Sequence, residues 1–406
     1  MVLRRPRGSG RSHPRRRRHG ARPPPGRGGR GVSGRVSPLE RDDRWARVAL
    51  SFLLEPKHRA TRDRLAAEGG AAALAAIRER RAAGGGEVYV RVPELDLDGL
   101  VASVRGLGVR VLVPGDPEWP VGLDRHEDPP YCLYVRGEPD LAALVERAVS
   151  VVGSRAASSY GLRVAADLGE DLAGRGWTVV SGAAFGIDAA AHRGALAGAG
   201  PTVAVLACGV DIAYPRAHDR LIASVADAGA VVAEVPPGAA PMRGRFLARN
   251  RVIALLSRAT VVVEAGLRSG SLSTAREARE HHVPVGAVPG PVTSATSAGC
   301  HELLRETDAV LVTDAADVAE LAARIGEDLA PARRPEPLPT DALAPDEYAL
   351  WAAAPVRRWL PPERLAVLSG TDPLRVPAAL AVLEALGLLE RSDGGWRKCA
   401  PTAGAR

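Results

Sequence analysis

The chain has 406 residues, of which 46% are hydrophobic and 25% charged, a balance typical of a soluble globular protein with more than one domain. No apolar run approaches the ~20 residues that a membrane-spanning helix requires, and no apolar segment follows the arginine-rich N-terminus as a secretory signal would require. We therefore expect a cytoplasmic protein without a membrane partner. The four cysteines lie far apart with no CxxC spacing, which predicts neither a disulfide framework nor a bound metal.

Basic residues are distributed unevenly. Twelve arginines and no acid fall within residues 1–35, and without them the formal charge drops from +7 to about −5. Residues 1–37 contain too few apolar side chains to build a core, so we expect a disordered basic tail that either grips nucleic acid non-specifically or is simply solvated. Any nucleic-acid site in the folded part must then be a local basic patch.

Taken in chain order, the first predicted elements form a small module. Residues 38–84 carry apolar residues at helical spacing, as in Trp45, Val48 and Leu53, and predict a small helical domain. Two short strands, Val109–Val113 and Tyr131–Val135, then flank proline-rich turns.

From about residue 148 the pattern becomes that of an α/β fold. Short apolar runs alternate with helical spacing such as Val164, Leu168 and Leu172. The expected strands are Val149–Val152, Thr178–Ser181, Thr202–Ala207, Ala230–Glu234, Thr260–Glu264, Pro284–Val288 and Ala309–Val312. Continuous rather than alternating runs are typical of strands buried on both faces of a parallel sheet. We predict an extended Rossmann-like core over residues 85–325, with a doubly wound, mostly parallel sheet.

A second small unit is predicted near the C-terminus. Residues 326–342 are rich in proline and acid and are expected to form a linker. The helical runs that follow are Glu347–Ala354, Pro362–Leu368 and Pro373–Leu386. A hairpin over 388–398 comes next, and this order favours a winged-helix-like domain over 343–400, with 401–406 as a tail.

Ligands of a doubly wound sheet bind where strands end and loops enter helix N-termini. The first such loop holds Gly153, Ser154 and Arg155, which offer close backbone approach, a hydroxyl and a two-pronged phosphate contact. A tight turn with a solvent-facing arginine is the alternative.

The second loop, Ser181–Asp188, contains Gly182 and Gly186 and suits an anion-binding nest. In this loop Phe185 could stack on a base or could plug the loop against the domain. Asp188 and His192 have the spacing of an acid–base pair, but we favour Asp188 as a helix-start residue and His192 as a structural one.

Arginines concentrate further along, with eight of them against three glutamates between residues 241 and 280. The densest group consists of Arg243, Arg245, Arg249 and Arg251, close to Phe246 and Asn250, and it favours phosphate contact although some of these arginines must be structural. Ser269, Gly270, Ser271 and Thr274 at a predicted helix start also suit phosphate. Glu264 is a candidate acid–base carboxylate, yet such a residue more often anchors a loop amide or an arginine.

A catalytic set is missing from the sequence. We find neither a serine with a credible His/Asp pair, nor an acidic cluster for Mg²⁺, nor a GxxxxGK[ST] loop, nor a GxGxxG fingerprint after the first core strand. Glycines, hydroxyls and arginines along one edge suit gripping several phosphates. We therefore expect a binding protein with no catalytic residues and no cofactor.

Several ordered motifs resemble those of the DprA/Smf family of DNA-processing proteins. They are DPPYCLYVRG (128–137), VVGSR (151–155), SGAAFGIDAAAHRGAL (181–196), LACGVDIAYP (206–215), RNRVIALLS (249–257), VVVEAGLRSGSLSTAREA (261–278) and VPG (288–290). The resemblance covers about residues 40–315, and the C-terminal module is similar to the winged helix that many members carry.

The resemblance implies a protein that binds single-stranded DNA without strong sequence preference, protects incoming strands and helps to load RecA recombinase in DNA uptake and recombination. It also implies a homodimer without established enzymatic activity. The nucleic-acid-binding residues expected from the loops and the resemblance together are Gly153, Ser154, Arg155, Ser181, Gly182, Phe185, Gly186, Asp188, Arg243, Arg249, Asn250, Arg251, Ser269, Gly270, Ser271 and Thr274.

The chain departs from the family pattern at three positions. Leu247 stands where members often have proline, Phe185 where smaller or aliphatic residues are common, and Cys300 near a usual asparagine, so loop shape and one hydrogen bond are in question.

Two rival functions remain open. One is a Rossmann-like nucleotide N-glycosidase using Glu264, although GLRSGSLSTA replaces the PGGxGT-type loop expected there. The other is a duplex-binding regulator, although the candidate recognition segment Pro373–Leu386 carries Arg375 as its single base.

Overall fold

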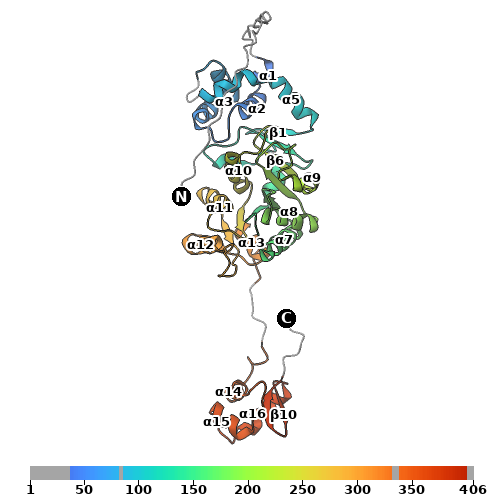
Figure 1. The fold of residues 1–406 in the computed structure, drawn as a ribbon, viewed down its shortest axis with the longest axis vertical. Coiled ribbons are helices and arrows are strands. Elements are labelled where there is room, and N and C mark those ends of the chain that lie inside the picture. The colour runs from blue at the N-terminus through green and yellow to red at the C-terminus, as the bar shows by residue number, and fades with distance from the viewer. Residues whose placement is uncertain (1–36, 82–85, 332–337, 400–406) are drawn as a thin grey trace, which may run out of the picture. The chain divides into compact units, whose positions relative to one another are not determined.

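The computed structural model describes residues 37–81, 86–331 and 338–399. The chain divides after Ala330 into two units, which are treated separately below (Figure 1). The predicted basic tail, residues 1–37, lies outside the described residues except for Ser37. Among the described residues, no helix combines the length and the apolar character needed to cross a membrane.

The first unit is built on a nine-stranded sheet in the order β1-β2-β6-β5-β4-β3-β7-β8-β9. The strands are β1 Arg110–Leu112, β2 Leu133–Arg136, β3 Ala148–Val152, β4 Thr178–Ser181, β5 Thr202–Leu206, β6 Ala230–Ala233, β7 Ala259–Val262, β8 Val285–Ala287 and β9 Val310–Leu311. Strands β3 to β9 pair in parallel, while β1 and β2 form an antiparallel edge. Every predicted strand of this unit is present, which confirms the predicted α/β class.

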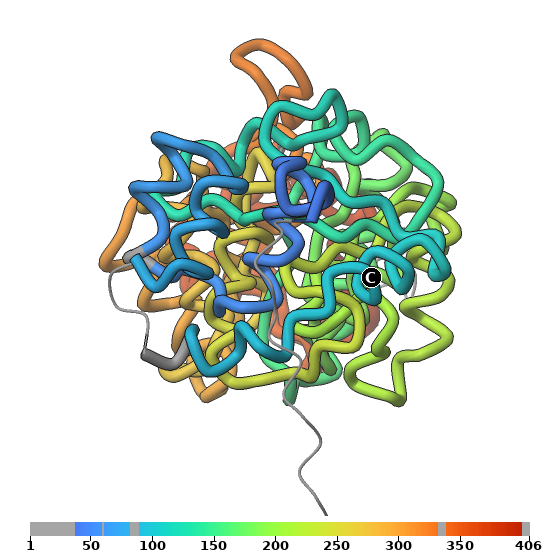
Figure 2. Tube along the Cα trace, turned by 90° about the horizontal axis from the view of Figure 1, so that it is seen from above, coloured from blue at the N-terminus to red at the C-terminus, as the bar shows by residue number. Residues whose placement is uncertain are grey.

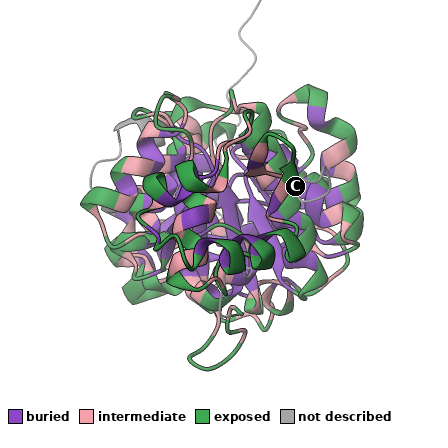
Figure 3. Ribbon diagram, turned by 90° about the horizontal axis from the view of Figure 1, so that it is seen from below, coloured by how far each residue is buried: buried purple, intermediate pink, exposed green. Residues whose placement is uncertain are grey.

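Helices cover both faces of this sheet. Those that follow strands β2 to β9 are α6 Leu141–Glu146, α7 Ser159–Gly174, α8 Ile187–Ala197, α9 Asp219–Ala228, α10 Arg243–Leu255, α11 Ser271–Glu280, α12 Ala298–Glu306 and α13 Ala315–Ala322. Because successive strand residues face opposite sides, Ala148 and Val152 of β3 pack with α10, α11 and α12, whereas Val149 and Val151 pack with α7, α8 and α13. Figure 3 shows the result, with buried residues along the strands and inner helix faces and exposed residues outside.

The N-terminal helices share a core with the sheet. They are α1 Pro38–Arg41, α2 Asp43–Leu53, α3 Arg59–Arg78, α4 Gly86–Arg91 and α5 Leu97–Gly106. Leu50 and Leu74 from these helices lie in one hydrophobic cluster with Tyr134, Leu206 and Val231 of the sheet. Figure 2 shows this segment, drawn in blue, lying across the top of the core. A separate domain ending at residue 84 remains a prediction.

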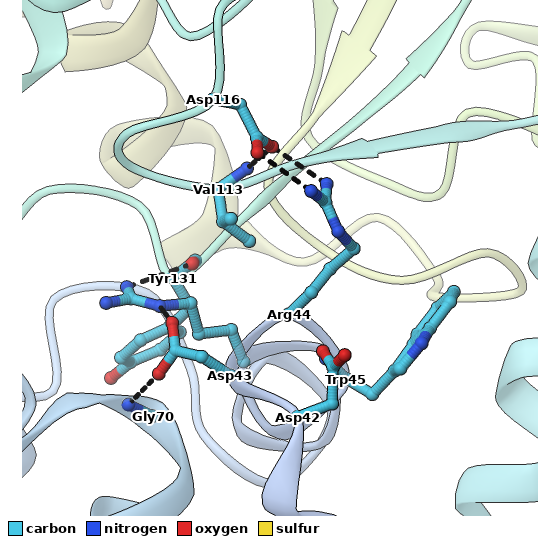
Figure 4. A network of polar contacts seen from close by, with 9 residues as sticks. Asp42, Asp43, Arg44, Trp45, Gly70, Val113, Asp116 and Tyr131 are labelled. Atoms are coloured by element: carbon cyan, nitrogen blue, oxygen red, sulfur yellow. Dashed lines mark hydrogen bonds and ion pairs between the residues drawn. The ribbon is translucent and has the colours of Figure 1, made fainter. Parts of the chain in front are cut away.

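A polar network fixes α2 on the edge of the sheet (Figure 4). The Arg44 guanidinium forks onto both carboxylate oxygens of Asp116, at 2.7 and 2.8 Å, in the loop after β1. Asp43 accepts a bond of 2.6 Å from Arg47, which also donates to the Tyr131 carbonyl oxygen at 3.3 Å. The Val113 amide also donates to Asp116 at 2.8 Å. Each ion pair is thus bonded to the backbone near β1 or β2, and together the pairs set how the helices sit against the β1–β2 edge.

The second unit contains α14 Pro345–Ala353, α15 Pro362–Ser369, α16 Val376–Ala385 and a hairpin of β10 Leu389–Ser392 and β11 Gly395–Lys398. Leu350, Leu365, Leu380, Leu383 and Trp396 build its small core. The predicted order of three helices and a hairpin is present, and the winged-helix assignment of this unit stays a prediction.

Candidate nucleic-acid interface

A large cavity of the first unit opens where the sheet changes direction. From β3 the chain winds through β4, β5 and β6 on one side, and α10 then carries it back to β7 on the other side of β3. At such a switch point the loops after the two central strands separate and leave a crevice. The cavity here measures about 820 Å³. The residues lining it are Val152, Gly153, Ser154, Arg155, Ala156, Ala184, Asp188, Tyr214, Pro241, Arg243, Phe246, Leu247, Arg249, Asn250, Ile253, Gly266, Arg268, Ser269, Gly270, Ser271 and Thr274.

The loop after β3 is held between two neighbouring elements. The Ser154 amide donates to the Glu264 carbonyl oxygen at 2.7 Å, and the Ser154 carbonyl oxygen accepts from the Ile187 amide at 3.2 Å. A Cβ on Gly153 would lie 2.5 Å from Ile187 Cγ1 and 2.8 Å from the Glu264 carbonyl oxygen, so this position requires glycine. The loop is therefore rigid, and it presents Arg155 at the cavity wall.

Arg249 forms part of the cavity floor and is buried. Its Nη1 donates to the carbonyl oxygens of Gly182, at 3.0 Å, and Val205, at 2.6 Å. The guanidinium lies so close to Gly182 that a Cβ there would collide with it. Burial lowers the pKa of Arg249 to about 10, and the group remains charged at neutral pH. It is thus a fixed positive charge with limited freedom to follow a ligand.

Asp188 closes the loop between β4 and α8. Its Oδ2 accepts from the amides of Gly182, at 3.2 Å, and Ala184, at 3.4 Å. Burial raises the pKa of Asp188, and the nearby Arg249 opposes that rise. His192 is fully buried, its Nδ1 is bonded to Thr202 Oγ1 at 2.7 Å, and burial lowers its pKa to about 3. The pair thus has the structural roles that we favoured from the sequence.

Two helix ends complete the cavity. Arg243, Phe246 and Asn250 lie at helical spacing on one face of α10. Asn250 Nδ2 donates to the Gly270 carbonyl oxygen at 3.3 Å and so ties α10 to the first turn of α11. Ser271 is in that turn, which carries the positive end of the helix dipole.

The cavity is strongly basic. Among the described residues that line it, Arg155, Arg243, Arg249 and Arg268 face a single acid, Asp188. Arg155, Arg243 and Arg268 are exposed, and no carboxylate in the described ranges lies within ion-pair distance of them. Guanidinium groups that are exposed and unpaired can neutralise phosphates without first breaking an internal bond.

Five predicted binding residues do not line the cavity. Arg251 is the clearest correction, because it is fully buried and paired with Glu234 at 2.5 Å, and it cannot reach a ligand. Ser181 is buried and donates to the Val151 carbonyl oxygen at 2.7 Å. Gly182 and Gly186 lie outside the lining, packed against Arg249 and against the backbone of Ser154 and Arg155, respectively. Phe185 follows the lining residue Ala184, and 48% of its surface is exposed. The other predicted residues all line it.

Some lining residues were not predicted as binding residues. Tyr214, Phe246 and Arg268 belong to motifs quoted above or lie next to the arginine cluster. The spacing of Arg243, Phe246, Leu247 and Asn250 on one helical face is the signal that could have identified Phe246 and Leu247. Among the departures from the family pattern, Leu247 lines the cavity, whereas Cys300 is buried with its Sγ 3.5 Å from the Val262 carbonyl oxygen.

The candidate carboxylate Glu264 anchors a loop. It is 1% exposed, and it accepts from the Ser158 amide at 2.8 Å, from Ser158 Oγ at 2.6 Å and from Thr296 Oγ1 at 3.1 Å. Its oxygens are thus occupied by internal donors at the start of α7 and in the loop before α12.

One group of side chains in the described part of the chain has metal-like proximity, namely His126, Glu277 and His281, with ligand atoms within 4.8 Å. Lys57 Nζ already binds the Glu277 carboxylate at 2.8 Å, and the Asp128 amide donates to His126 Nδ1 at 2.8 Å. A neutral imidazole that accepts at Nδ1 carries its proton on Nε2, so His126 does not offer a free nitrogen. We interpret these three side chains, with Lys57, as a charge-balanced contact and not as a metal site.

A doubly wound sheet with a basic cavity at its switch point defines a Rossmann-like protein suited to an anionic ligand. The family model for DNA recombination-mediator protein A matches residues 110–323, more than half of the chain. A putative DNA processing protein DprA from Mycobacterium tuberculosis is 48% identical over 301 residues, covering 71% of this chain and 77% of that protein. The chain therefore belongs to the DNA recombination-mediator protein A family, which confirms the resemblance to DprA/Smf proteins.

Two further comparisons agree. The DNA processing protein DprA of Streptococcus pneumoniae is 41% identical over 203 residues, covering 50% of this chain and 71% of that protein. A crystal structure of DprA from Streptococcus pneumoniae matches with a TM-score of 0.58 at 32% identity, covering 67% of this chain and 94% of that one.

Proposed function

We propose that this protein binds single-stranded DNA in the switch-point cavity without strong sequence preference, as a DNA-processing protein of uptake and recombination. The observation that carries the proposal is the lining: three exposed arginines without acid partners, a buried fourth and the first turn of α11. Contacts of this kind address the sugar-phosphate backbone, which is the same in every sequence.

We further propose that the protein is not an enzyme and acts in the cytoplasm. The carboxylate nearest to a catalytic position, Glu264, is saturated by internal donors, and the Asp188–His192 pair holds structure. Protection of strands, RecA loading and homodimerisation are also part of the proposal, and membership of the family supports them.

The C-terminal unit fits a role other than duplex reading. Arg375 precedes α16 and is paired with Asp346 at 3.0 Å, and the exposed face of α16 is largely apolar. A recognition helix without free cations gains little from a phosphate backbone. We propose that residues 343–400 form a winged-helix-like domain that contacts protein.

Fluorescence anisotropy with labelled oligonucleotides tests the binding proposal. Wild-type protein is expected to bind a random single strand more tightly than the matched duplex, with affinity rising with length. Arg155→Ala and Arg243→Ala are expected to weaken binding alike for all sequences. Arg175→Ala is the matched control, because Arg175 is exposed at the end of α7 on the opposite edge of the sheet. Unchanged affinity in both cavity variants would overturn the site.

A further inference from the structure

Aromatic side chains are scarce in this chain, yet three of them lie in the cavity lining or in the loop beside it. The 406 residues include three phenylalanines, and two of them belong to this set together with Tyr214. Phe246 and Tyr214 line the cavity, and Phe185 follows the lining residue Ala184. A gathering of rare residues around one opening needs a cause beyond the packing of a core.

Two of these rings remain open to solvent. Phe185 is 48% exposed and Tyr214 is 41% exposed. Leaving an aromatic surface in water gives up the hydrophobic free energy that its burial would supply. About half of the Phe185 side chain is therefore left over from the plugging of its loop, which was one of the two roles that the sequence left open for it.

Each exposed ring is held in position by a second ring. Phe185 contacts His218 edge-on, with centroids 4.7 Å apart, and the buried His218 is itself bonded through Nδ1 to the Ala183 carbonyl oxygen at 2.9 Å. Tyr214 contacts Phe246, with ring centroids 5.6 Å apart. Side chains fixed before binding lose little conformational entropy when a ligand arrives.

A cation–π contact joins an arginine to the same aromatic cluster. The Arg155 guanidinium lies over the Phe246 ring, 5.1 Å from its centroid. A guanidinium group and aromatic rings thus lie side by side in the cavity lining, a combination that can hold the phosphates and bases of a single strand.

We propose that Phe185 and Tyr214 are stacking platforms, each for one base of a bound single strand, while the cavity arginines hold the phosphates. This inference rests on the proposed function and adds the elements that recognise unpaired bases. Because bases in a duplex already stack on one another, the platforms favour single strands over duplex. Because every base has a π-face, they leave sequence preference weak.

Affinity for an intact oligonucleotide is compared with affinity for the same oligonucleotide carrying abasic sites. Phe185→Ala and Tyr214→Ala are each expected to weaken binding of the intact strand about tenfold, a typical loss for one stacked base. Tyr214→Phe retains the ring and is the matched control, with wild-type affinity expected. On the abasic strand the alanine variants are expected to bind as wild type does, whereas Arg243→Ala remains weakened.

The outcomes separate this inference from the function beneath it. Equal affinities of both alanine variants and wild type for the intact strand, with Arg243→Ala still weakened, overturn the platforms and leave the cavity intact. A loss of the same size on intact and abasic strands also overturns them, because the rings would then act through loop shape. Failure of wild-type protein to bind any single strand overturns the proposed function itself. Phe185→Leu, which keeps most of the side-chain volume, replaces Phe185→Ala if the latter unfolds, and the same loss is expected.

Discussion

Replacing Glu264 by glutamine should lower the free energy of unfolding by about 2–3 kcal/mol. Glu264 Oε1 accepts from Ser158 Oγ and Thr296 Oγ1, and Oε2 accepts from the Ser158 amide. A glutamine can keep its carbonyl oxygen at the first position, but its amino group then faces the Ser158 amide, donor against donor. One charge-assisted bond, worth about 1.5–3 kcal/mol, is lost and two others lose their charge.

Thermal and urea unfolding measure this loss. A change of this size lowers Tm by about 4–12 °C for a domain of this class. Glu280→Gln is the control, because Glu280 is exposed at the end of α11, and wild-type stability is expected for it. The wild-type protein and both variants are then incubated with nucleoside monophosphates, and no free base is expected from any of them.

The opposite results would refute the structural role of Glu264. If Glu264→Gln unfolds as wild type does, and if wild-type protein releases free base that the variant cannot release, then Glu264 is a catalytic residue. The rival N-glycosidase function would then replace DNA binding as the role of the cavity.

Three further results are expected. Arg251→Met leaves the Glu234 carboxylate buried without its partner and should cost about 3–5 kcal/mol in urea unfolding, whereas a cost near zero would show the pair to be dispensable. Burial raises the pKa of Glu277, but contacts with His126 and Lys57 outweigh it and bring the pKa to about 2, so its stabilisation is present above about pH 4.5 and is lost toward pH 2. Lys57→Met should shrink this acid-dependent loss, and an unchanged pH profile would contradict the contact. Gly153→Ala should destabilise the protein by about 1–3 kcal/mol, since its Cβ has no room beside Ile187; wild-type stability would contradict that geometry.

Much of the fold could be predicted from the sequence, because strands buried on both faces must be continuously apolar. Val149–Val152 and Thr202–Ala207 are such runs, and both are strands. The fold of the N-terminal region was harder to predict. Helix α5, Leu97–Gly106, was not predicted, and the shared core of Leu50 with Tyr134 depends on contacts between segments far apart in sequence.

The site was predictable in the loop after β3, with Gly153 and Arg155, because the carboxyl ends of parallel strands meet at one edge. The same rule failed after β4, where Gly182 lies outside the lining. The site was not predictable on α10. Arg249 and Arg251 are two positions apart on a helix and so point to nearly opposite sides. α10 is buried on both sides, so periodicity does not reveal which arginine meets the cavity and which meets Glu234.

The salt dependence of single-strand binding tests the central claim most directly. Affinity is measured between about 50 and about 200 mM salt for wild type and for a variant with Arg155, Arg243 and Arg268 all changed to alanine. Each phosphate contact contributes about −0.7 to the log–log slope. The account predicts a wild-type slope of about −2 or steeper that flattens by about 2 units in the variant. A slope that is the same in both proteins would contradict it.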